Sequence, residues 1–301
     1  MEHERDGFLQ AAAVLPPELR QRALALGPKE RERAEELRLR VGRPLTAVLP
    51  EGERALGGGA VCPQDLQRLL ELASRASVHA VLPQLREGFV TVTGGHRVGL
   101  CGTAAVEDGR ILTLRSLSSA CVRVARQFPG IARPVAGALL EEGRLQNTLI
   151  LAPPGAGKTS LLRDLIRTIS EGDGVPPLRV GVADQRGELG AAFQGVPQLE
   201  LGRRTDLLDG CPKAQGLMML LRSMNPQVLA VDEVTAPEDV RALTDAGGCG
   251  AVLLASVHGA GREDLRRRAL YRELTETGLF RRLVTIQGTG AGRRYAVEVL
   301  E

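Results

Sequence analysis

The chain has 301 residues, of which 43% are hydrophobic and 25% charged, with a formal net charge of +3. These values predict one large or two medium globular domains with an ordinary core. No apolar run approaches the roughly 20 residues of a membrane-spanning helix. The charged start of the chain, residues 1–6, also lacks the apolar stretch of a signal peptide. We therefore expect a cytoplasmic protein, which protein partners can still hold at a membrane surface.

The composition gives no support to a cysteine-bound metal or to nucleic-acid binding. The five cysteines are scattered and no pair has metal-ligand spacing. The charge is nearly balanced, and two tyrosines, five phenylalanines and no tryptophan offer little for base stacking. Lysine is rare, with three lysines (Lys29, Lys158 and Lys213) against 36 arginines. A lysine at a given position is therefore more informative than an arginine.

The first 127 residues predict a small α+β domain. Helical structure from residue 8 gives way to an alternating strand, and later apolar runs are separated by glycine-rich turns. In chain order we expect strands at 36–41 and 45–49, a helix at 63–74, a hairpin of strands 89–92 and 97–100, and further strands at 111–114 and 121–125.

Residues 128–301 predict a second domain, in which strands and helices alternate. In chain order we expect a helix at 134–142, strand 147–152, helix 158–170, strand 179–184, helix 212–223, strand 228–231, helix 237–246 and strand 251–255. This order is typical of an α/β fold with a parallel sheet and helices on both faces. Ligands of such sheets bind at the carboxyl ends of the strands. A closing β-pair at 281–287 and 295–300 has no predicted function.

One segment has the pattern of a triphosphate-binding loop. A buried strand ends at Ala152, and the residues expected to bind nucleotide follow: Pro153, Pro154, Gly155, Ala156, Gly157, Lys158, Thr159 and Ser160. The two glycines let the backbone wrap the phosphates, and N–H groups at the helix start point at the anion. Lys158 would reach the β- and γ-phosphates, and the Thr159 hydroxyl would hold Mg²⁺. Ala152 replaces the usual first glycine and is tolerable if its φ is negative.

A second apolar strand, Val228-Leu229-Ala230-Val231, ends in the carboxylates Asp232 and Glu233. A parallel sheet would deliver both acids to its phosphate-binding edge. We expect Asp232 to belong to the Mg²⁺ shell and Glu233 to polarise the attacking water. Hydrolysis needs such a base, whereas nucleotide binding alone does not.

Two further strand ends carry candidate catalytic residues. Asp184 ends an apolar strand and Glu188 follows it, so both can lie beside the γ-phosphate and order Mg²⁺ or water. The alternative for this pair is a helix cap or a surface salt bridge. His258 ends a later strand and either senses the γ-phosphate or is a hydrogen-bonded structural residue.

Together these motifs resemble the stage III sporulation protein AA group of endospore-forming bacteria, which is related to the ATPases of type II and type IV secretion and pilus assembly. The phosphate loop alone is unspecific, and its combination with the other segments carries the resemblance. These segments are Gly94-Gly95-His96-Arg97-Val98-Gly99, residues 152–164, Asp184-Gln185-Arg186-Gly187-Glu188-Leu189, Leu221-Arg222-Ser223-Met224-Asn225-Pro226-Gln227, Val231-Asp232-Glu233 and Ser256-Val257-His258-Gly259.

The resemblance implies a P-loop ATPase core with a RecA-like sheet and a homo-oligomeric ring, usually a hexamer. It implies ATP and Mg²⁺ as ligands, and membrane proteins of a sporulation channel complex as partners. In the related secretion ATPases, conserved boxes correspond to Asp184 with Glu188 and to His258. Here Gln185 stands where the sporulation family is expected to show an acid, and Asp232 stands where many secretion ATPases have glycine.

The resemblance also implies that arginines from the amino-terminal domain or from a neighbouring subunit complete the site. Such a cation contributes roughly 10³–10⁵ in rate to phosphoryl transfer. The candidates are, in order of preference, Arg97, Arg115 and Arg123. In a chain with so many arginines, each can equally be a solvated surface residue.

Two other functional classes stay open beside a ring ATPase. One is a nucleotide-gated scaffold that binds ATP with little turnover. The residues Ala152 and Gln185, which differ from the expected motifs, favour this class. The other is a nucleic-acid-stimulated ATPase, which the few aromatic residues and the balanced charge disfavour. The chain contains no Asn-Lys-x-Asp motif for reading guanine, so the sequence favours ATP over GTP.

Overall fold

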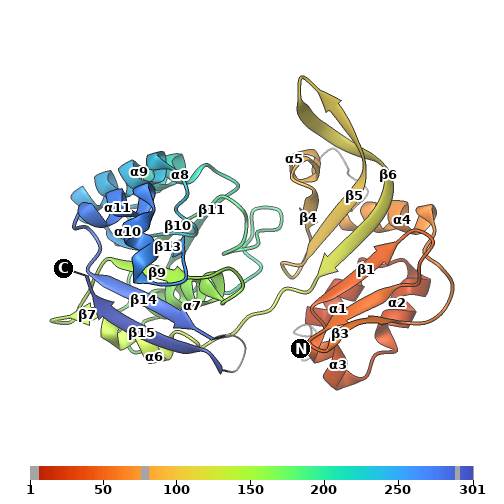
Figure 1. The fold of residues 1–301 in the computed structure, drawn as a ribbon, viewed down its shortest axis with the longest axis horizontal. Helices are drawn as coiled ribbons and strands as arrows, with labels where there is room; N and C mark the ends of the chain where they lie inside the picture. Colours follow the sequence, from red (N-terminus) through yellow and green to blue (C-terminus); the bar gives the residue numbers. More distant parts are fainter. Residues whose placement is uncertain (1–6, 76–80, 289–291, 301) are drawn as a thin grey trace. The chain divides into compact units, whose positions relative to one another are not determined.

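The computed structural model describes residues 7–75, 81–288 and 292–300. The charged residues 1–6, which contributed to the expected location, lie outside the described residues. The chain divides into two compact units, Met1–Arg126 and Gln127–Glu301. Each unit has its own main sheet and buries its own apolar residues against it, so each is described by itself (Figure 1). The division lies one residue before the boundary expected from the sequence.

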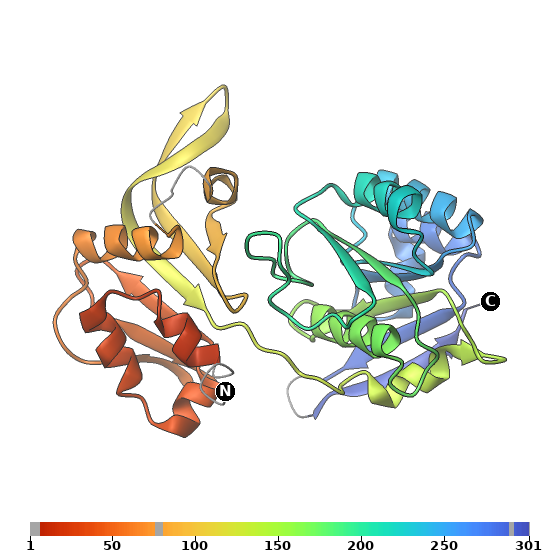
Figure 2. The ribbon, with the colours of Figure 1, turned by 180° about the vertical axis from the view of Figure 1, so that it is seen from behind.

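The amino-terminal unit is an antiparallel sheet with helices on one face. Its strands have the order β3-β2-β1-β6-β5-β4. They are β1 (Glu36–Arg40), β2 (Thr46–Leu49), β3 (Gly52–Ala55), β4 (Phe89–Thr91), β5 (Arg97–Glu107) and β6 (Arg110–Arg123). The helices are α1 (Gly7–Ala12), α2 (Pro17–Leu24), α3 (Pro28–Arg33), α4 (Pro63–Ala73) and α5 (Leu82–Arg86). Helices α1, α2 and α4 lie over the sheet face that is nearer the viewer in Figure 2.

Alternation along β1 explains which face of this sheet is covered. Leu37 and Leu39 are fully buried and belong to the same core as residues of α1, α2 and α4. Between them, Arg38 and the flanking Glu36 and Arg40 are only half-buried, because successive side chains of a strand point to opposite faces. The period-two pattern read from the sequence is therefore confirmed.

The prediction of two separate strands at 111–114 and 121–125 was wrong, because both belong to the single strand β6. The intervening Ser-rich segment has little strand propensity of its own. Its backbone nevertheless pairs with β5, and a register shift between Cys101 and Thr103 absorbs the irregularity. Ser116, at this irregularity, has a positive φ of 43°. The ladder with β5 thus overrides the local preference.

The carboxy-terminal unit contains a seven-stranded sheet of order β11-β10-β12-β13-β9-β14-β15. All neighbours are parallel except β14 and β15. The strands are β9 (Thr148–Ala152), β10 (Val180–Asp184), β11 (Thr205–Asp209), β12 (Val228–Val231), β13 (Val252–His258), β14 (Arg282–Gln287) and β15 (Arg294–Val299). The longer helices are α7 (Lys158–Glu171), α8 (Lys213–Met224), α9 (Pro237–Gly248) and α11 (Ala269–Glu276), and α10 (Arg262–Arg267) is shorter.

Helices cover both faces of this sheet, as the alternation of strands and helices predicts. Along β9, Ile150 and Ala152 belong to the core that contains α7. Leu149 and Leu151 belong to a second core that contains α8, α9 and α11. Each β9 residue from 149 to 152 is at most 1% exposed. Such burial on both sides explains why the strand is a continuous apolar run.

The helix expected at 134–142 was wrong in its length. The structure has the short helix α6 (Arg133–Ala136), a single 3₁₀ turn (Gly137–Leu139), and a hairpin of β7 (Leu140–Glu141) with β8 (Arg144–Leu145). Glycine at position 137 weakens the helical pattern, and Gly143 has a positive φ of 76° in the turn of the hairpin. The apolar residues that suggested a long helix are thus shared between a short helix and the hairpin.

The structure also contains an edge strand that the sequence pattern does not predict. Strand β11 has the sequence Thr-Asp-Leu-Leu-Asp and pairs with β10 in parallel. Its two acids and its half-buried residues give it no apolar pattern, because an edge strand is not buried on both sides. The closing pair β14 and β15 is confirmed, and β14 also pairs in parallel with β9.

Parallel pairing brings several loops to one edge of the carboxy-terminal sheet. The strands β9, β10, β12, β13 and β14 all end there. The segments that follow these strands contain the phosphate loop, Glu188, Asp232 with Glu233, and the connection from β14 to β15. The topology therefore assembles residues that are far apart in the chain.

Candidate active site

The predicted phosphate loop joins β9 to α7. Gly155 and Gly157 have positive φ values of 75° and 97°, which a residue with a Cβ adopts only with strain. Ala152 lies before the loop, as the last residue of β9, and pairs with His258 of β13. It has an extended conformation that any residue can adopt, so the missing first glycine does not disturb the loop.

Lys158 and Thr159 at the start of α7 face the two carboxylates that follow β12. The Thr159 hydroxyl donates to Oδ2 of Asp232 over 2.5 Å. The Nζ atom of Lys158 lies 3.7 Å from Oδ1 of Asp232 and 3.3 Å from Oε1 of Glu233. Lys158 is only 4% exposed, so the two carboxylates stabilise its charge in place of water. The structure thus brings together the four residues to which the sequence assigned phosphate, metal and base roles.

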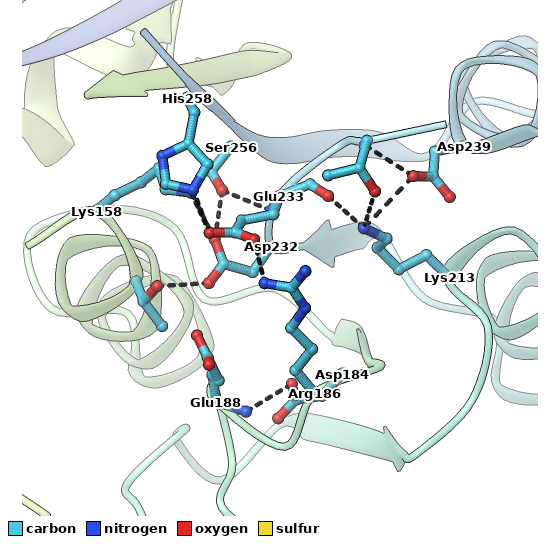
Figure 3. A network of polar contacts seen from close by, with 12 residues as sticks. Lys158, Asp184, Arg186, Glu188, Lys213, Asp232, Glu233, Asp239, Ser256 and His258 are labelled. Carbon is cyan, nitrogen blue, oxygen red and sulfur yellow. Dashed lines mark hydrogen bonds and ion pairs between the residues drawn. The ribbon is translucent and has the colours of Figure 1, made fainter. Parts of the chain in front are cut away.

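Ser256 of β13 fixes both carboxylate residues. Its hydroxyl donates to Oδ1 of Asp232 and accepts the backbone N–H of Glu233 over 2.8 Å (Figure 3). One carboxylate oxygen of Asp232 therefore accepts a hydrogen bond from Ser256, and the other accepts one from Thr159. From the sequence, Ser256 was part of a motif without a predicted role. The alternation of β13 places it on the same side as the two acids.

The Glu233 carboxylate is surrounded by cationic or potentially cationic groups. Its Oε1 contacts Lys158 and Nε2 of His258, and its Oε2 accepts from Arg186 over 2.6 Å (Figure 3). Burial by itself would raise the pKa of Glu233, but Lys158 and His258 together lower that pKa below its ordinary value. Glu233 is therefore an ionised acceptor near neutral pH. Its backbone has a positive φ of 54°.

His258 lies at the end of β13, beside the phosphate loop. Its Nε2 contacts Glu233, whereas its Nδ1 is buried and has no hydrogen-bond partner among the described residues. The structure thus places the predicted histidine within the constellation. Its expected role as a sensor of the γ-phosphate stays a prediction.

Asp184 anchors the loop that follows β10. Its Oδ1 accepts the N–H of Glu188, and its Oδ2 accepts those of Leu189 and Gly190, each over 2.9 Å. The side chain is 2% exposed, and this burial raises the pKa of Asp184 despite the three backbone donors. From α7, Arg163 donates to the carbonyls of Glu188 and Leu189. These contacts hold a loop and are neither the helix cap nor the surface salt bridge of the alternative, because no helix begins at residues 185–190 and Asp184 is buried. A direct catalytic role for Asp184 stays a prediction.

Glu188 is held by the same loop at the edge of the site. Its half-buried side chain points toward the part of the network that contains Asp232 (Figure 3). Glu188 and Arg186 line a small cavity together with Asp184, Asp232 and Glu233. The neighbouring Gln185, which stands where the sporulation family is expected to show an acid, is exposed on this loop. Ordering of Mg²⁺ or water by Glu188 stays a prediction.

Lys213 is a residue of the site that the sequence reading missed. Its ammonium group donates to the backbone carbonyl of Glu233 and, over 3.2 Å, to Oγ1 of Thr235. It also lies 3.4 Å from Oδ2 of Asp239, which caps the start of α9. Lys213 is 6% exposed. The available signal was the rarity of lysine, since two of the three lysines lie buried at this site.

Comparison with known proteins identifies the family. A model described as "Sporulation stage III, protein AA" matches residues 9–296. This chain belongs to the stage III sporulation protein AA family. It is 38% identical over 278 residues to the stage III sporulation protein AA of Bacillus subtilis, an alignment that covers 92% of this chain and 90% of the relative. The resemblance predicted from the motifs is therefore confirmed.

Solved structures of ATPases share the fold of this sporulation-family chain. The Legionella pneumophila ATPase DotB matches with a TM-score of 0.59 and 16% identity, covering 89% of this chain and 77% of that one. The pilus retraction motor PilT, solved with bound ADP, matches with a TM-score of 0.58 and 14% identity, covering 90% of this chain and 80% of that one. The predicted P-loop NTPase fold is confirmed.

The three candidate arginines, Arg97, Arg115 and Arg123, all lie in the amino-terminal unit. Arg97 of β5 places its guanidinium 4.5 Å from the centroid of the Phe89 ring, where it lines a cavity of about 310 Å³. Arg123 of β6 pairs with Glu36 at 3.3 Å, and Arg115 is exposed. Completion of the active site by any of these three stays a prediction.

Among the described residues, no helix is long and apolar enough to cross a membrane.

Proposed function

We propose that this stage III sporulation protein AA family member hydrolyses ATP in the presence of Mg²⁺, as a secretion-type ATPase. One observation carries the proposal. At the end of the phosphate loop, Lys158 lies within 3.7 Å of the carboxylates of Asp232 and Glu233, and Thr159 donates a hydrogen bond to Asp232. A phosphate cradle, a candidate metal ligand pair and a base thus meet at the edge of one sheet.

The phosphate loop supplies binding. The N–H groups at the start of α7 and the Lys158 ammonium group provide the positive charge that the β- and γ-phosphates need. Residues 153–160 form the predicted contact segment. For Mg²⁺, the Thr159 hydroxyl and the Asp232 carboxylate are oxygen ligands of the kind that this ion prefers. The ion would neutralise charge on the transferred phosphoryl group.

Glu233 supplies the base. Water attacks the γ-phosphorus, its proton passes to the Glu233 carboxylate, and the bond to the ADP oxygen breaks. The lowered pKa of Glu233 keeps the acceptor ionised before the reaction. Lys213 and Ser256 hold the backbone of this residue, so the carboxylate approaches from a fixed direction. Positioning of this kind is a large part of catalysis in phosphoryl transfer.

Within this proposal the protein works as a homo-oligomeric ring, in which arginines such as Arg97 complete a neighbour's site. The ring, most simply a hexamer, would serve membrane proteins of a channel complex during endospore formation. The family membership supports the sporulation context. The likeness to PilT, a pilus retraction motor, supports a motor role.

The experiment that tests the proposal is steady-state phosphate release from ATP by the wild type and by Glu233→Gln. Both are measured over a range of protein concentrations, with the mass determined in parallel. We expect turnover that rises with assembly and is lost in the variant. Absent turnover in an assembled wild type, with no effect of Glu233→Gln, would overturn the ATPase proposal.

A second candidate function, the nucleotide-gated scaffold, is favoured by the contacts of Glu233. Its carboxylate is engaged by Lys158, Arg186 and His258, and such a carboxylate must be released before it can act as a base. The two functions predict different effects of the same variants on spore formation in cells. If Lys158→Ala abolishes spore formation and Glu233→Gln does not, binding suffices and the scaffold is correct. If both variants abolish it, turnover is required.

A further inference from the structure

The closing β-pair brings an arginine to the phosphate loop. Because β14 runs parallel to β9, its carboxyl end lies at the same edge of the sheet as Ala152. The chain returns to this edge at Arg293, directly before β15. Arg293 and the loop are thus neighbours, although more than a hundred residues separate them in the sequence.

The Arg293 guanidinium packs directly against Gly157. A Cβ placed on Gly157 would lie only 2.7 Å from Cζ of Arg293, 2.9 Å from Nη1 and 3.0 Å from Nη2. Any side chain at position 157 would therefore displace the guanidinium. Gly157 thus permits both the positive φ of the loop and the close approach of this cation.

Within the described part of the chain, no carboxylate pairs with the Arg293 guanidinium. Among the described residues, Arg293 makes no ion pair, and its buried Nε has no hydrogen-bond partner. The other cation of the loop, Lys158, is held by Asp232 and Glu233. An unpaired guanidinium beside a loop that presents N–H groups at a helix start favours an anionic ligand with several oxygens.

The position of Arg293 indicates which part of a nucleotide it meets. The strands β12 and β13, which position Asp232, Glu233 and His258, lie on one side of β9, and β14 lies on the other. The γ-phosphate belongs beside Glu233, so a cation from the opposite side meets the phosphates that are not transferred. These phosphates are common to ADP and ATP.

We propose that Arg293 binds the diphosphate part of the nucleotide from the β14 side of the phosphate loop. This inference rests on the proposed binding of nucleotide at that loop. It assigns a function to the closing β-pair, for which the sequence offered none. The residue contributes to affinity for ADP and for ATP alike, because both nucleotides carry the diphosphate that it contacts.

The test is the dissociation constant of ADP, measured by titration calorimetry for the wild type, Arg293→Ala and Arg293→Lys. The neighbouring exposed Arg294 gives a matched control, Arg294→Ala, which removes the same charge one residue further along. We expect Arg293→Ala to weaken ADP and ATP alike by about tenfold to a hundredfold, as for loss of a charged hydrogen bond. Arg293→Lys retains part of the affinity, and Arg294→Ala stays within about twofold of the wild type.

Two further measurements keep the inference falsifiable. A phosphate contact predicts the same fold-loss for ADP, GDP and UDP, whereas a loss that depends on the base would overturn the assignment to phosphate. Unchanged ADP affinity in a folded Arg293→Ala, with normal wild-type binding, would overturn the role of Arg293 alone. A wild type that binds no nucleotide would overturn the proposed function, and this inference with it.

Discussion

The ammonium group of Lys213 donates a hydrogen bond to the backbone carbonyl of Glu233, the proposed base (Figure 3). Glu233 has a positive φ, which is uncommon for a residue with a long side chain. Such a conformation persists where its surroundings hold it. Lys213 supplies one of these contacts from the start of α8, and Ser256 supplies another from β13. The direction of the Glu233 carboxylate thus depends on elements far apart in the chain.

The first prediction is that Lys213→Met lowers kcat about tenfold to a hundredfold, because a small displacement of a reacting group costs this much. ADP affinity should stay within about threefold, since the phosphate loop is not touched. The variant also loses about 3 kcal/mol of stability, because the buried Asp239 loses its cation. Turnover, ADP titration and denaturant unfolding measure the three effects.

The matched control for Lys213 is Asp239→Asn. It removes the ion pair but keeps the contact between Lys213 and the Glu233 carbonyl. We expect reduced stability with nearly normal kcat. An equal loss of kcat in both variants would show that Lys213 acts only through general stability.

The second prediction concerns Mg²⁺ and the Thr159 hydroxyl. Thr159→Val keeps the shape of the side chain but removes the donor to Asp232 and the proposed metal ligand. In the wild type, Mg²⁺ should tighten ATP binding, and in the variant this gain should fall by about tenfold or more. Titration of ATP with and without Mg²⁺ measures the gain, and Thr159→Ser should retain it. An undiminished gain in Thr159→Val would exclude Thr159 as a ligand.

The sequence could predict those parts of the site that lie directly at strand ends. The apolar runs before Ala152 and Asp232 showed buried parallel strands, and parallel strands must end at one edge. Lys213 and Arg293 could not be predicted in this way. Their partners, Glu233 and Gly157, are distant in sequence, and only the pairing of β14 with β9 and the packing of α8 bring them together.

The fold was predictable where the local pattern agreed with the tertiary structure. Strand β6 was predicted as two strands and α6 as a longer helix, because contacts with neighbouring elements determine the bounds of both. Pairing with β5 continues the strand through a polar segment, and the β7–β8 hairpin takes residues that have a helical pattern. Neither the strand pairing nor the hairpin can be predicted from the short-range periodicity of apolar residues.

The third prediction follows from the buried histidine of the glycine-rich hairpin. His96 is 1% exposed, and its Nδ1 accepts the N–H of Ala125 over 2.9 Å. Burial lowers the pKa of His96 from 6.5 to about 4. Between these values the unfolded chain binds the extra proton, so stability is lost as the pH falls through 6.5 and toward 4.

When the pH falls from 7 to 5, we expect protonation of His96 in the unfolded chain to lower the free energy of unfolding by about 2 kcal/mol. His96→Gln keeps an acceptor for the Ala125 amide but does not titrate, so its pH dependence should be flatter by this amount. Unfolding in urea at both pH values, followed by hydrogen exchange of the Ala125 amide, measures the difference. Parallel pH profiles of the two proteins would contradict the assignment.

The fourth prediction separates loop anchoring from catalysis at the two acids after β10. Asp184→Asn offers one oxygen where the carboxylate now accepts three N–H groups, so it leaves buried donors unsatisfied. We expect a loss of about 1–3 kcal/mol in stability. Turnover should fall as well, because the loop also carries Arg186 and Glu188.

The comparison variant, Glu188→Gln, should leave stability unchanged, since its backbone contacts to Asp184 and Arg163 remain. Thermal unfolding and phosphate release, measured on both variants, decide between the roles. If Asp184→Asn abolishes turnover without any loss of stability, Asp184 acts on the nucleotide itself and its hydrogen bonds to the loop are secondary.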